Sequence, residues 1–417
     1  MSDSVRGYPL RAFVICLIAY TTAQMDLALF GYAVPAIRAE FGLTLSEVMA
    51  IVSSAFLLGG ALLVVLGWLA DRMGRLPLFQ FSLLGSSFLV ALISIASGVA
   101  TLTALRGASI AVGGLSYPIT GAIITEEMPA RLRGLFMGLL QIGYPLGWAL
   151  ASLWSMWLLT EYGWRQLFWV GLISLPMVWV VRRYLREPPR SVAARSTQSP
   201  PRFSDLFATG IRERAITLFI AQFLFVWAYA ASIFLFPSFL REVRALDAFN
   251  FSLLIGAGNA IGVLGYVLAA WIGERVWTRR NTVVLWTLLG ALLFQVLVWV
   301  PTSFGQILLV YALMSMFFYG SAAVKFAYLA EVFPTRIRAL AMACCGSLAV
   351  TLGSAAGPYT VSLAIESWGW HLGYATLVGV PLALAGLLYL TLESLPSGLE
   401  VEDIVIRIEK EAQPSHG

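Results

Sequence analysis

A series of twelve apolar runs constrains the fold of this chain more than any other feature. Most runs are close to the roughly 20 residues that a helix needs to cross the hydrocarbon core of a bilayer. Because a backbone in lipid must satisfy its own hydrogen bonds, we expect each run to be an α-helix. The runs cover residues 12–36, 48–70, 77–98, 101–125, 134–158, 166–185, 214–240, 250–273, 281–301, 304–330, 339–364 and 372–392.

Composition supports an integral membrane protein. Hydrophobic residues make up 59% of the chain and charged residues 12%, about half the charged share of a soluble domain. The three cysteines all lie in apolar runs, so we expect neither a disulfide framework nor a metal site. The first run lacks a cleavage site of small residues, which predicts that it remains as a spanning helix.

The runs fall into two groups of six. A segment rich in Arg, Pro and Ser separates them and is typical of a solvated linker. We therefore expect an all-α membrane protein with an N-terminal six-helix half at 1–185, a cytoplasmic linker at 186–213, a C-terminal half at 214–393 and a cytoplasmic tail at 394–417.

The two halves share landmarks at an offset near 205 residues. The pattern Glu-x-x-Pro-x-Arg-x-Arg begins at Glu126 and again at Glu331. Gly163-Trp-Arg recurs as Gly369-Trp-His. These matches indicate an internal duplication, and paired halves around a site at the midplane are typical of secondary transporters.

Arginine placement predicts the orientation. Most arginines lie in the N-terminal arm, the linker and alternate loops, whereas the opposite loops carry Arg38, Arg165, Arg241 and Arg244. Loops rich in Lys and Arg stay in the cytoplasm, so both termini are expected there. This bias also accounts for the net charge of +5, and we expect no nucleic-acid partner.

A charged break between the second and third runs reads Gly67-Trp-Leu-Ala-Asp71-Arg72-Met-Gly74-Arg75. Its glycines permit a tight turn, and a helix terminus can orient Asp71. The segment resembles the signature loop of the major facilitator superfamily. The first run, with Asp-x-x-x-x-Gly-x-x-x-Pro-Ala at 26–36, and the fourth, at 106–133, resemble its aromatic-acid/proton symporter branch and the niacin and organic-anion relatives.

The resemblance implies two halves that alternate access to a central cavity and a charge lock that closes the cytoplasmic side in one state. In that lock Asp71 faces a helix N-terminus and an arginine of the loop between the fourth and fifth runs. The alternative is plain solvation of a loop. The expected lock residues are Gly67, Asp71, Arg72, Gly74, Arg75, Arg131, Arg133, Arg336 and Arg338.

Three charged residues lie inside the runs: Asp26, Arg106 and Lys325. A charge in hydrocarbon costs at least about 2.5–3.5 kcal/mol, so each should face a cavity or a partner. Counting roughly 1.5 Å per residue from the ends of their runs places Asp26 and Arg106 at the same depth. Lys325 either extends its stem to the cytoplasmic surface or lies beside the substrate.

We interpret Asp26 and Arg106 as a coupling pair. Burial opposes ionisation of the carboxyl and the arginine favours it, so protonation can depend on which way the cavity opens. A proton on Asp26 would release Arg106 to bind a substrate carboxylate in a bidentate manner. The alternative is a static pair that serves packing.

The candidate sites extend beyond this pair. Proton coupling is predicted for Asp26, Glu126 and Glu331. Substrate binding is predicted for Arg106, Tyr117, Thr120, Gln141, Gln222, Tyr229 and Lys325, where ordinary helix packing is the alternative for the uncharged residues.

The chain contains two histidines, no Walker loop and no metal-spaced Cys/His cluster, so we expect no enzyme, cofactor or metal. The sequence predicts a monomeric, proton-coupled symporter of a small organic anion, a carboxylate that can be aromatic, in a bacterial inner membrane. The alternatives are a proton-driven exporter of drugs or metabolites with the same fold, and a transporter-like membrane sensor.

Overall fold

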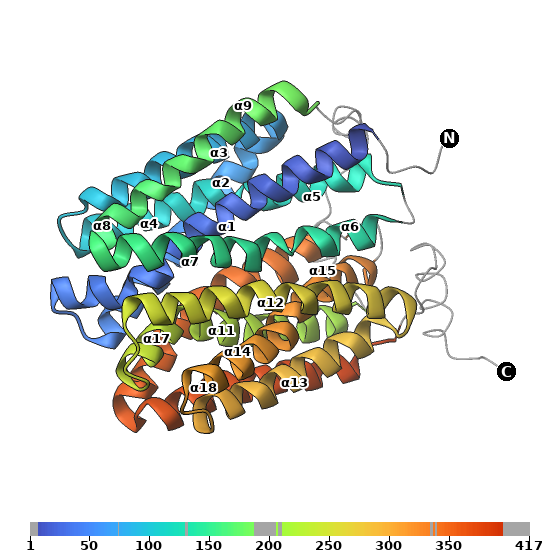
Figure 1. The fold of residues 1–417 in the computed structure, drawn as a ribbon. Coiled ribbons are helices and arrows are strands. Elements are labelled where there is room, and N and C mark those ends of the chain that lie inside the picture. The colour runs from blue at the N-terminus through green and yellow to red at the C-terminus, as the bar shows by residue number, and fades with distance from the viewer. Residues whose placement is uncertain are drawn as a thin grey trace.

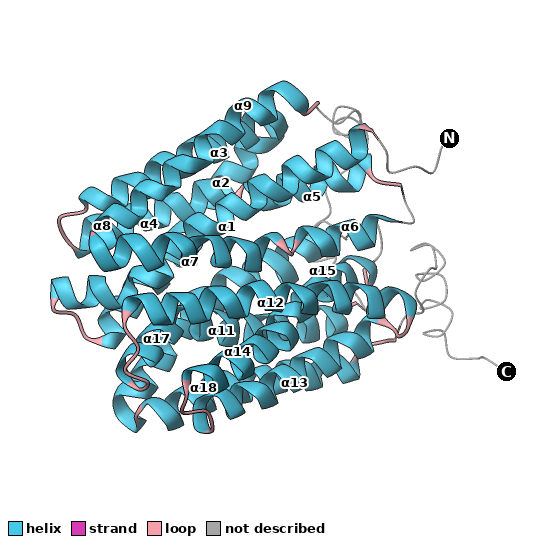
Figure 2. Cartoon of the chain, viewed as in Figure 1, coloured by secondary structure: helices cyan, strands magenta, loops and turns pink. Residues whose placement is uncertain are grey.

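A computed structural model describes residues 7–73, 75–129, 132–186, 206, 211–333, 337 and 340–394. In this part of the chain the backbone is helical with short connections, and twelve helical segments are long and apolar enough to cross a membrane (Figure 2). The predicted all-α fold with twelve spans is therefore confirmed. The linker residues 187–205 and 207–210 and the tail 395–417 lie outside the described residues.

The N-terminal half builds six spans. Several are broken by a short helix or a change of helix type near Gly or Pro, as is tolerated where neighbouring helices satisfy the freed backbone groups. Its elements are α1 (Tyr8–Phe41), α2 (Leu45–Met73), α3 (Arg75–Leu92), η1 (Ile93–Ile95), α4 (Val99–Gly114), α5 (Ser116–Glu127), α6 (Arg133–Leu140), α7 (Gly143–Glu161), α8 (Trp164–Leu167), η3 (Phe168–Ser174) and α9 (Leu175–Tyr184).

The C-terminal half builds the other six spans. Its elements are α11 (Arg212–Glu242), α12 (Ala248–Arg275), α13 (Arg279–Trp299), α14 (Phe304–Phe318), η6 (Tyr319–Ser321), α15 (Ala322–Glu331), the π-helical η7 (Met342–Leu348), α17 (Ala349–Trp368), α18 (Trp370–Leu388) and η8 (Tyr389–Thr391).

The first span is longer than its apolar run at both ends, since α1 covers Tyr8–Phe41 rather than 12–36. It ends at Gly42, whose φ of 64° is the left-handed conformation that commonly caps a helix. The repeat is visible in the backbone as well. Gly163 and Gly369 have φ values of 86° and 81° and immediately precede α8 and α18.

The halves pack as two bodies, with α7 against α12 and α2 against α17 at the boundary (Figure 1). Small residues permit these approaches: the Gly60 backbone lies against Thr351, and Gly256 against Ser152. Large apolar side chains such as Leu264 and Leu309 are exposed on the outside, as expected for surfaces that face lipid.

The helix bundle has two ends, the Tyr8 face and the Arg38 face. The Tyr8 face holds the start of α1 and the end of α9 (Figure 1). The Arg38 face holds the end of α1, the start of α2, the ends of α11 and α17 and the start of α18.

Candidate substrate and proton site

Asp26 and Arg106 meet inside the N-terminal half. Asp26 on α1 is 4% exposed and Arg106 on α4 is 2% exposed. The guanidinium donates to the main-chain oxygen of Leu27 at 2.8 Å and to that of Asp26 at 3.5 Å. It also lies over the ring of Phe30, 4.8 Å from its centroid. The position of Arg106 is thus fixed by the α1 backbone and one aromatic ring.

The main-chain oxygen of Asp26 accepts a hydrogen bond from Arg106, but the carboxylate of the same residue does not. Within the described residues, neither carboxylate oxygen has a hydrogen-bond donor. Arg106 acts on the carboxyl through space, and Ser174 of η3 faces it. A buried carboxylate without donors is expensive, and a proton removes that cost. The Asp26 carboxyl is therefore buried beside a cation without a direct ion pair in the described chain.

Lys325 on α15 provides a second buried cation in the other half. Its side chain is 2% exposed, and its ammonium has no hydrogen-bond partner among the residues that the structure describes. The ammonium lies against the ring of Phe225 on α11. Lys325 therefore does not extend to the surface in this structure but stays inside the bundle.

Aromatic rings surround the boundary between the halves near Lys325. The Tyr229 ring on α11 lies 5.3 Å from Tyr144 on α7 and 4.8 Å from Tyr319 on η6, between ring centroids. The Tyr117 ring on α5 lies 5.6 Å from Phe326, which follows Lys325 in the chain. Two of these pairs, Tyr144 with Tyr229 and Tyr117 with Phe326, join one half to the other.

We call this group the central aromatic cluster. Its members form two sets of ring contacts, Tyr20 with Tyr117 and Phe326, and Tyr144 with Phe225, Tyr229, Phe318 and Tyr319. Sequence reasoning identified Tyr117 and Tyr229 but missed Tyr144. The missed signal was spacing, because Tyr144 is three residues after Gln141 and so shares its helix face.

The amide and hydroxyl candidates divide into two groups. Gln141 is buried and donates to the Tyr117 hydroxyl at 3.3 Å, while its carbonyl oxygen has no donor in the described chain. Gln222 is buried as well. Thr120 instead donates to the main-chain oxygens of Ser116 and Tyr117, so its own helix satisfies its hydroxyl.

Glu126 lies at the far end of α5 and forms an ion pair with Arg75 at the start of α3. It is about twenty residues from Arg106 along the fourth span, roughly 30 Å for helical rise, so the structure does not bring it to Asp26. The side chain of Glu331 is not among those described.

Most of the predicted lock falls on positions or side chains outside the described ones. Arg75 has a described side chain and joins Glu126. The remaining lock residues either lie outside the described chain or have side chains that are not described: Gly67, Asp71, Arg72, Gly74, Arg131, Arg133, Arg336 and Arg338.

A bundle of two repeated six-span halves, with ionisable side chains buried at its centre, defines a membrane transporter. The sequence model of the Major Facilitator Superfamily matches residues 16–281 and 218–404. The chain belongs to this superfamily, as the signature loop predicted.

Three named relatives indicate which branch of the superfamily the chain resembles. The chain is 27% identical to the cis,cis-muconate transport protein of Acinetobacter baylyi over 88% of its own length and 90% of that protein. It is 26% identical to the niacin transporter of the same organism over 87% of its length and 89% of that protein. It is 24% identical to the gallate transporter of Pseudomonas putida over 93% of each. The predicted similarity to the aromatic-acid branch is confirmed.

A solved structure supports the fold. The chain superposes on a bacterial homolog of the human lysosomal transporter Spinster, in its inward-facing and occupied conformation, with a TM-score of 0.69. The match covers 100% of both chains at 14% identity. At this identity the similarity concerns the fold alone.

Proposed function

We propose that the protein is a proton-coupled symporter of a small organic acid that works by alternating access. The observation that carries this proposal is the set of three buried ionisable side chains, Asp26, Arg106 and Lys325, none of which forms an ion pair with another described residue. Such charges are costly inside a membrane unless a cargo or a proton uses them.

Lys325 and Arg106 supply the positive charge that a carboxylate requires. Among the described residues Lys325 has no competing acceptor, so an incoming carboxylate can form an ion pair with it. Arg106 is available once its contacts to the α1 backbone are exchanged for the substrate. The cargo would then lie between one cation from each half.

The central aromatic cluster suits a planar, conjugated acid. Edge-to-face and offset ring contacts stabilise aromatic cargo, and tyrosine hydroxyls can bind its polar substituents. Relatives named for muconate, niacin and gallate support an acid of this size and chemistry. The expected tyrosine contacts are with Tyr117, Tyr144 and Tyr229.

Asp26 would carry the proton. When protonated it no longer attracts Arg106 through space, so the guanidinium more easily exchanges its contacts with the α1 backbone for the substrate. When it loses the proton to the cytoplasm, Arg106 returns to α1 and the substrate is released. Charge is balanced in this cycle because a proton enters with each anion. The positive-inside bias supports the Tyr8 face as the cytoplasmic one.

Transport into proteoliposomes tests this proposal. Purified protein would be given labelled muconate, gallate or niacin, with a sugar and a cationic drug as controls. We expect uptake of at least one acid, stimulated by an alkaline interior and abolished by a protonophore. Transport of the drug but of no acid would favour the exporter. Binding without any flux would favour the sensor, although the relatives named here are described as transporters.

A further inference from the structure

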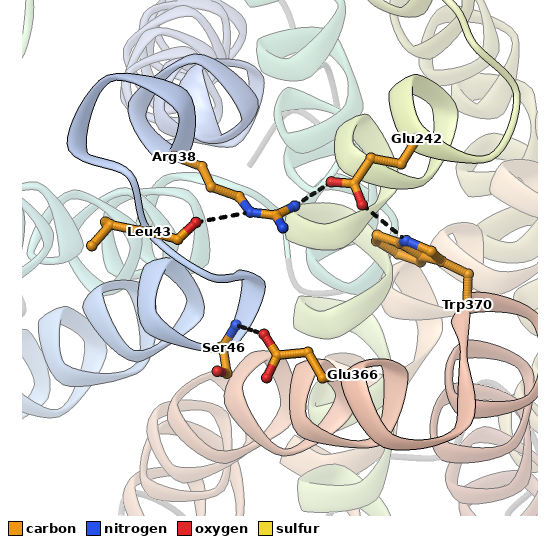
Figure 3. A network of polar contacts seen from close by, with 6 residues as sticks. All are labelled: Arg38, Leu43, Ser46, Glu242, Glu366 and Trp370. Atoms are coloured by element: carbon orange, nitrogen blue, oxygen red, sulfur yellow. Dashed lines mark hydrogen bonds and ion pairs between the residues drawn. The ribbon is translucent and has the colours of Figure 1, made fainter.

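An ion pair joins the two halves at the Arg38 face. Arg38 near the end of α1 pairs with Glu242 at the end of α11 (Figure 3). Each partner is also held by a contact on its own half. Arg38 Nε donates to the Leu43 oxygen at 3.1 Å, and Glu242 accepts from the Trp370 indole at 3.1 Å. The pair therefore connects two anchored side chains.

A second contact crosses the same boundary. The main-chain N–H of Ser46, in the first turn of α2, donates to Glu366 Oε1 at 2.8 Å (Figure 3). Glu366 lies near the end of α17 in the C-terminal half. N–H groups in the first turn of a helix have no partner within it and lie at the positive end of its dipole, so a carboxylate is stabilised there.

The internal repeat shows why an arginine of the N-terminal half pairs with a glutamate of the C-terminal half and not the reverse. Pro35 precedes Glu40 by five residues, and Pro237 precedes Glu242 by five, so the two glutamates are equivalent. Glu40 accepts from the indole of Trp164 at 2.6 Å, as Glu242 does from that of Trp370.

The repeat breaks at the residue after each tryptophan. In the N-terminal half this residue is Arg165, which pairs with Glu40. In the C-terminal half it is His371, whose ring packs 5.3 Å from that of Trp299. Glu242 thus receives no arginine from the equivalent position, and Arg38 of the other half supplies the charge. Leu240 stands where Arg38 would repeat, so no reciprocal pair forms.

We propose that Arg38, Glu242 and Glu366 form a latch that holds the Arg38 face closed, and that opening this face for cargo breaks both contacts. This inference rests on the alternating-access part of the proposed function. The side chains of Arg38 and Glu242 are 28% and 38% exposed. Pairs this exposed are weak, so the latch shifts the population of open and closed states by about two- to fivefold and does not lock it.

The chain offers a matched control for the test. Glu40→Gln and Glu242→Gln remove the same charge beside the same indole, but only Glu242 bridges the halves. Spin labels at Thr160→Cys and Ser303→Cys, in a background without Cys16, Cys344 and Cys345, would report the distance across the Arg38 face. Both positions are exposed, and each lies in a different half.

We expect Glu242→Gln and Arg38→Gln to increase the long-distance population two- to fivefold, and Glu40→Gln to leave it unchanged. Exchanging the charges, with Arg38→Glu and Glu242→Arg together, should restore the closed population. An unchanged distribution in both Arg38→Gln and Glu242→Gln, or the same change in Glu40→Gln, would overturn the latch. The distances require no substrate, so this result is independent of whether an acid is transported.

Discussion

The guanidinium of Arg106 contacts the main-chain oxygen of Asp26 and not its carboxylate. This arrangement keeps a positive charge close to the acid without satisfying its oxygens. Arg106 and the Asp26 carboxyl are thus buried neighbours that form no direct ion pair in the described chain. The relationship between these two residues is the basis for the first two predictions.

Asp26→Asn imitates the protonated acid and should separate binding from coupling. We expect exchange of external for internal substrate to continue at no less than about a third of the wild-type rate. Accumulation driven by a pH gradient should fall at least tenfold, because no proton is carried. Proteoliposomes loaded with unlabelled acid measure the first, and an imposed gradient measures the second.

Glu126→Gln tests the second predicted carboxyl, which lies at the other end of the fourth span. It should keep gradient-driven accumulation. If Asp26→Asn still accumulates substrate in response to the pH gradient, the proton site lies elsewhere, with Glu126 and Glu331 as the next candidates.

Lys325→Met should weaken substrate binding by at least tenfold, because it removes a buried charge that has no partner in the described part of the protein. Arg106→Lys should also weaken it, since an ammonium cannot reproduce the fork of a guanidinium. Thr120→Val is the control and should change affinity less than twofold, because the Thr120 hydroxyl is bound to its own helix. Equilibrium binding of the transported acid measures all three. Equal losses in the Lys325 and Thr120 variants would point to general disruption of the bundle.

Asp71→Asn should leave membrane insertion intact and slow transport at least tenfold, because the resemblance places this charge at a helix N-terminus in a lock. Surface expression and the initial rate of uptake are the two measurements. Normal rates in this variant would remove Asp71 from the lock. Arg75→Gln serves for comparison, since Arg75 pairs with Glu126 at the same end of the bundle.

The predicted orientation places the 186–213 linker in the cytoplasm. Ser199→Cys in intact cells should react with a permeant thiol reagent and stay unlabelled by an impermeant one. Thr160→Cys, at the end of α7 on the Arg38 face, should react with both. Reaction of Ser199→Cys with the impermeant reagent would reverse the assignment of the two faces.

The sequence by itself determined the spans, the duplication and the superfamily. Crossing a bilayer depends on the length and hydrophobicity of a local segment, and both can be read from consecutive residues. The signature loop at 67–75 and the repeated Gly-Trp pairs are local patterns too. The three buried charged residues could also be found from the sequence. A charged residue within an apolar run stands out whichever face of the helix it lies on.

Only the tertiary structure decided what these residues touch. A helix in a membrane is apolar toward lipid and toward its neighbours, so hydropathy does not reveal which face is buried or how far a helix is rotated. Sequence reasoning therefore expected Arg106 to hold the Asp26 carboxylate and overlooked Tyr144. Arg38 and Glu242 are separated by 204 positions in the chain. Nothing local to either residue indicates that they meet, because their contact depends on how the two halves dock.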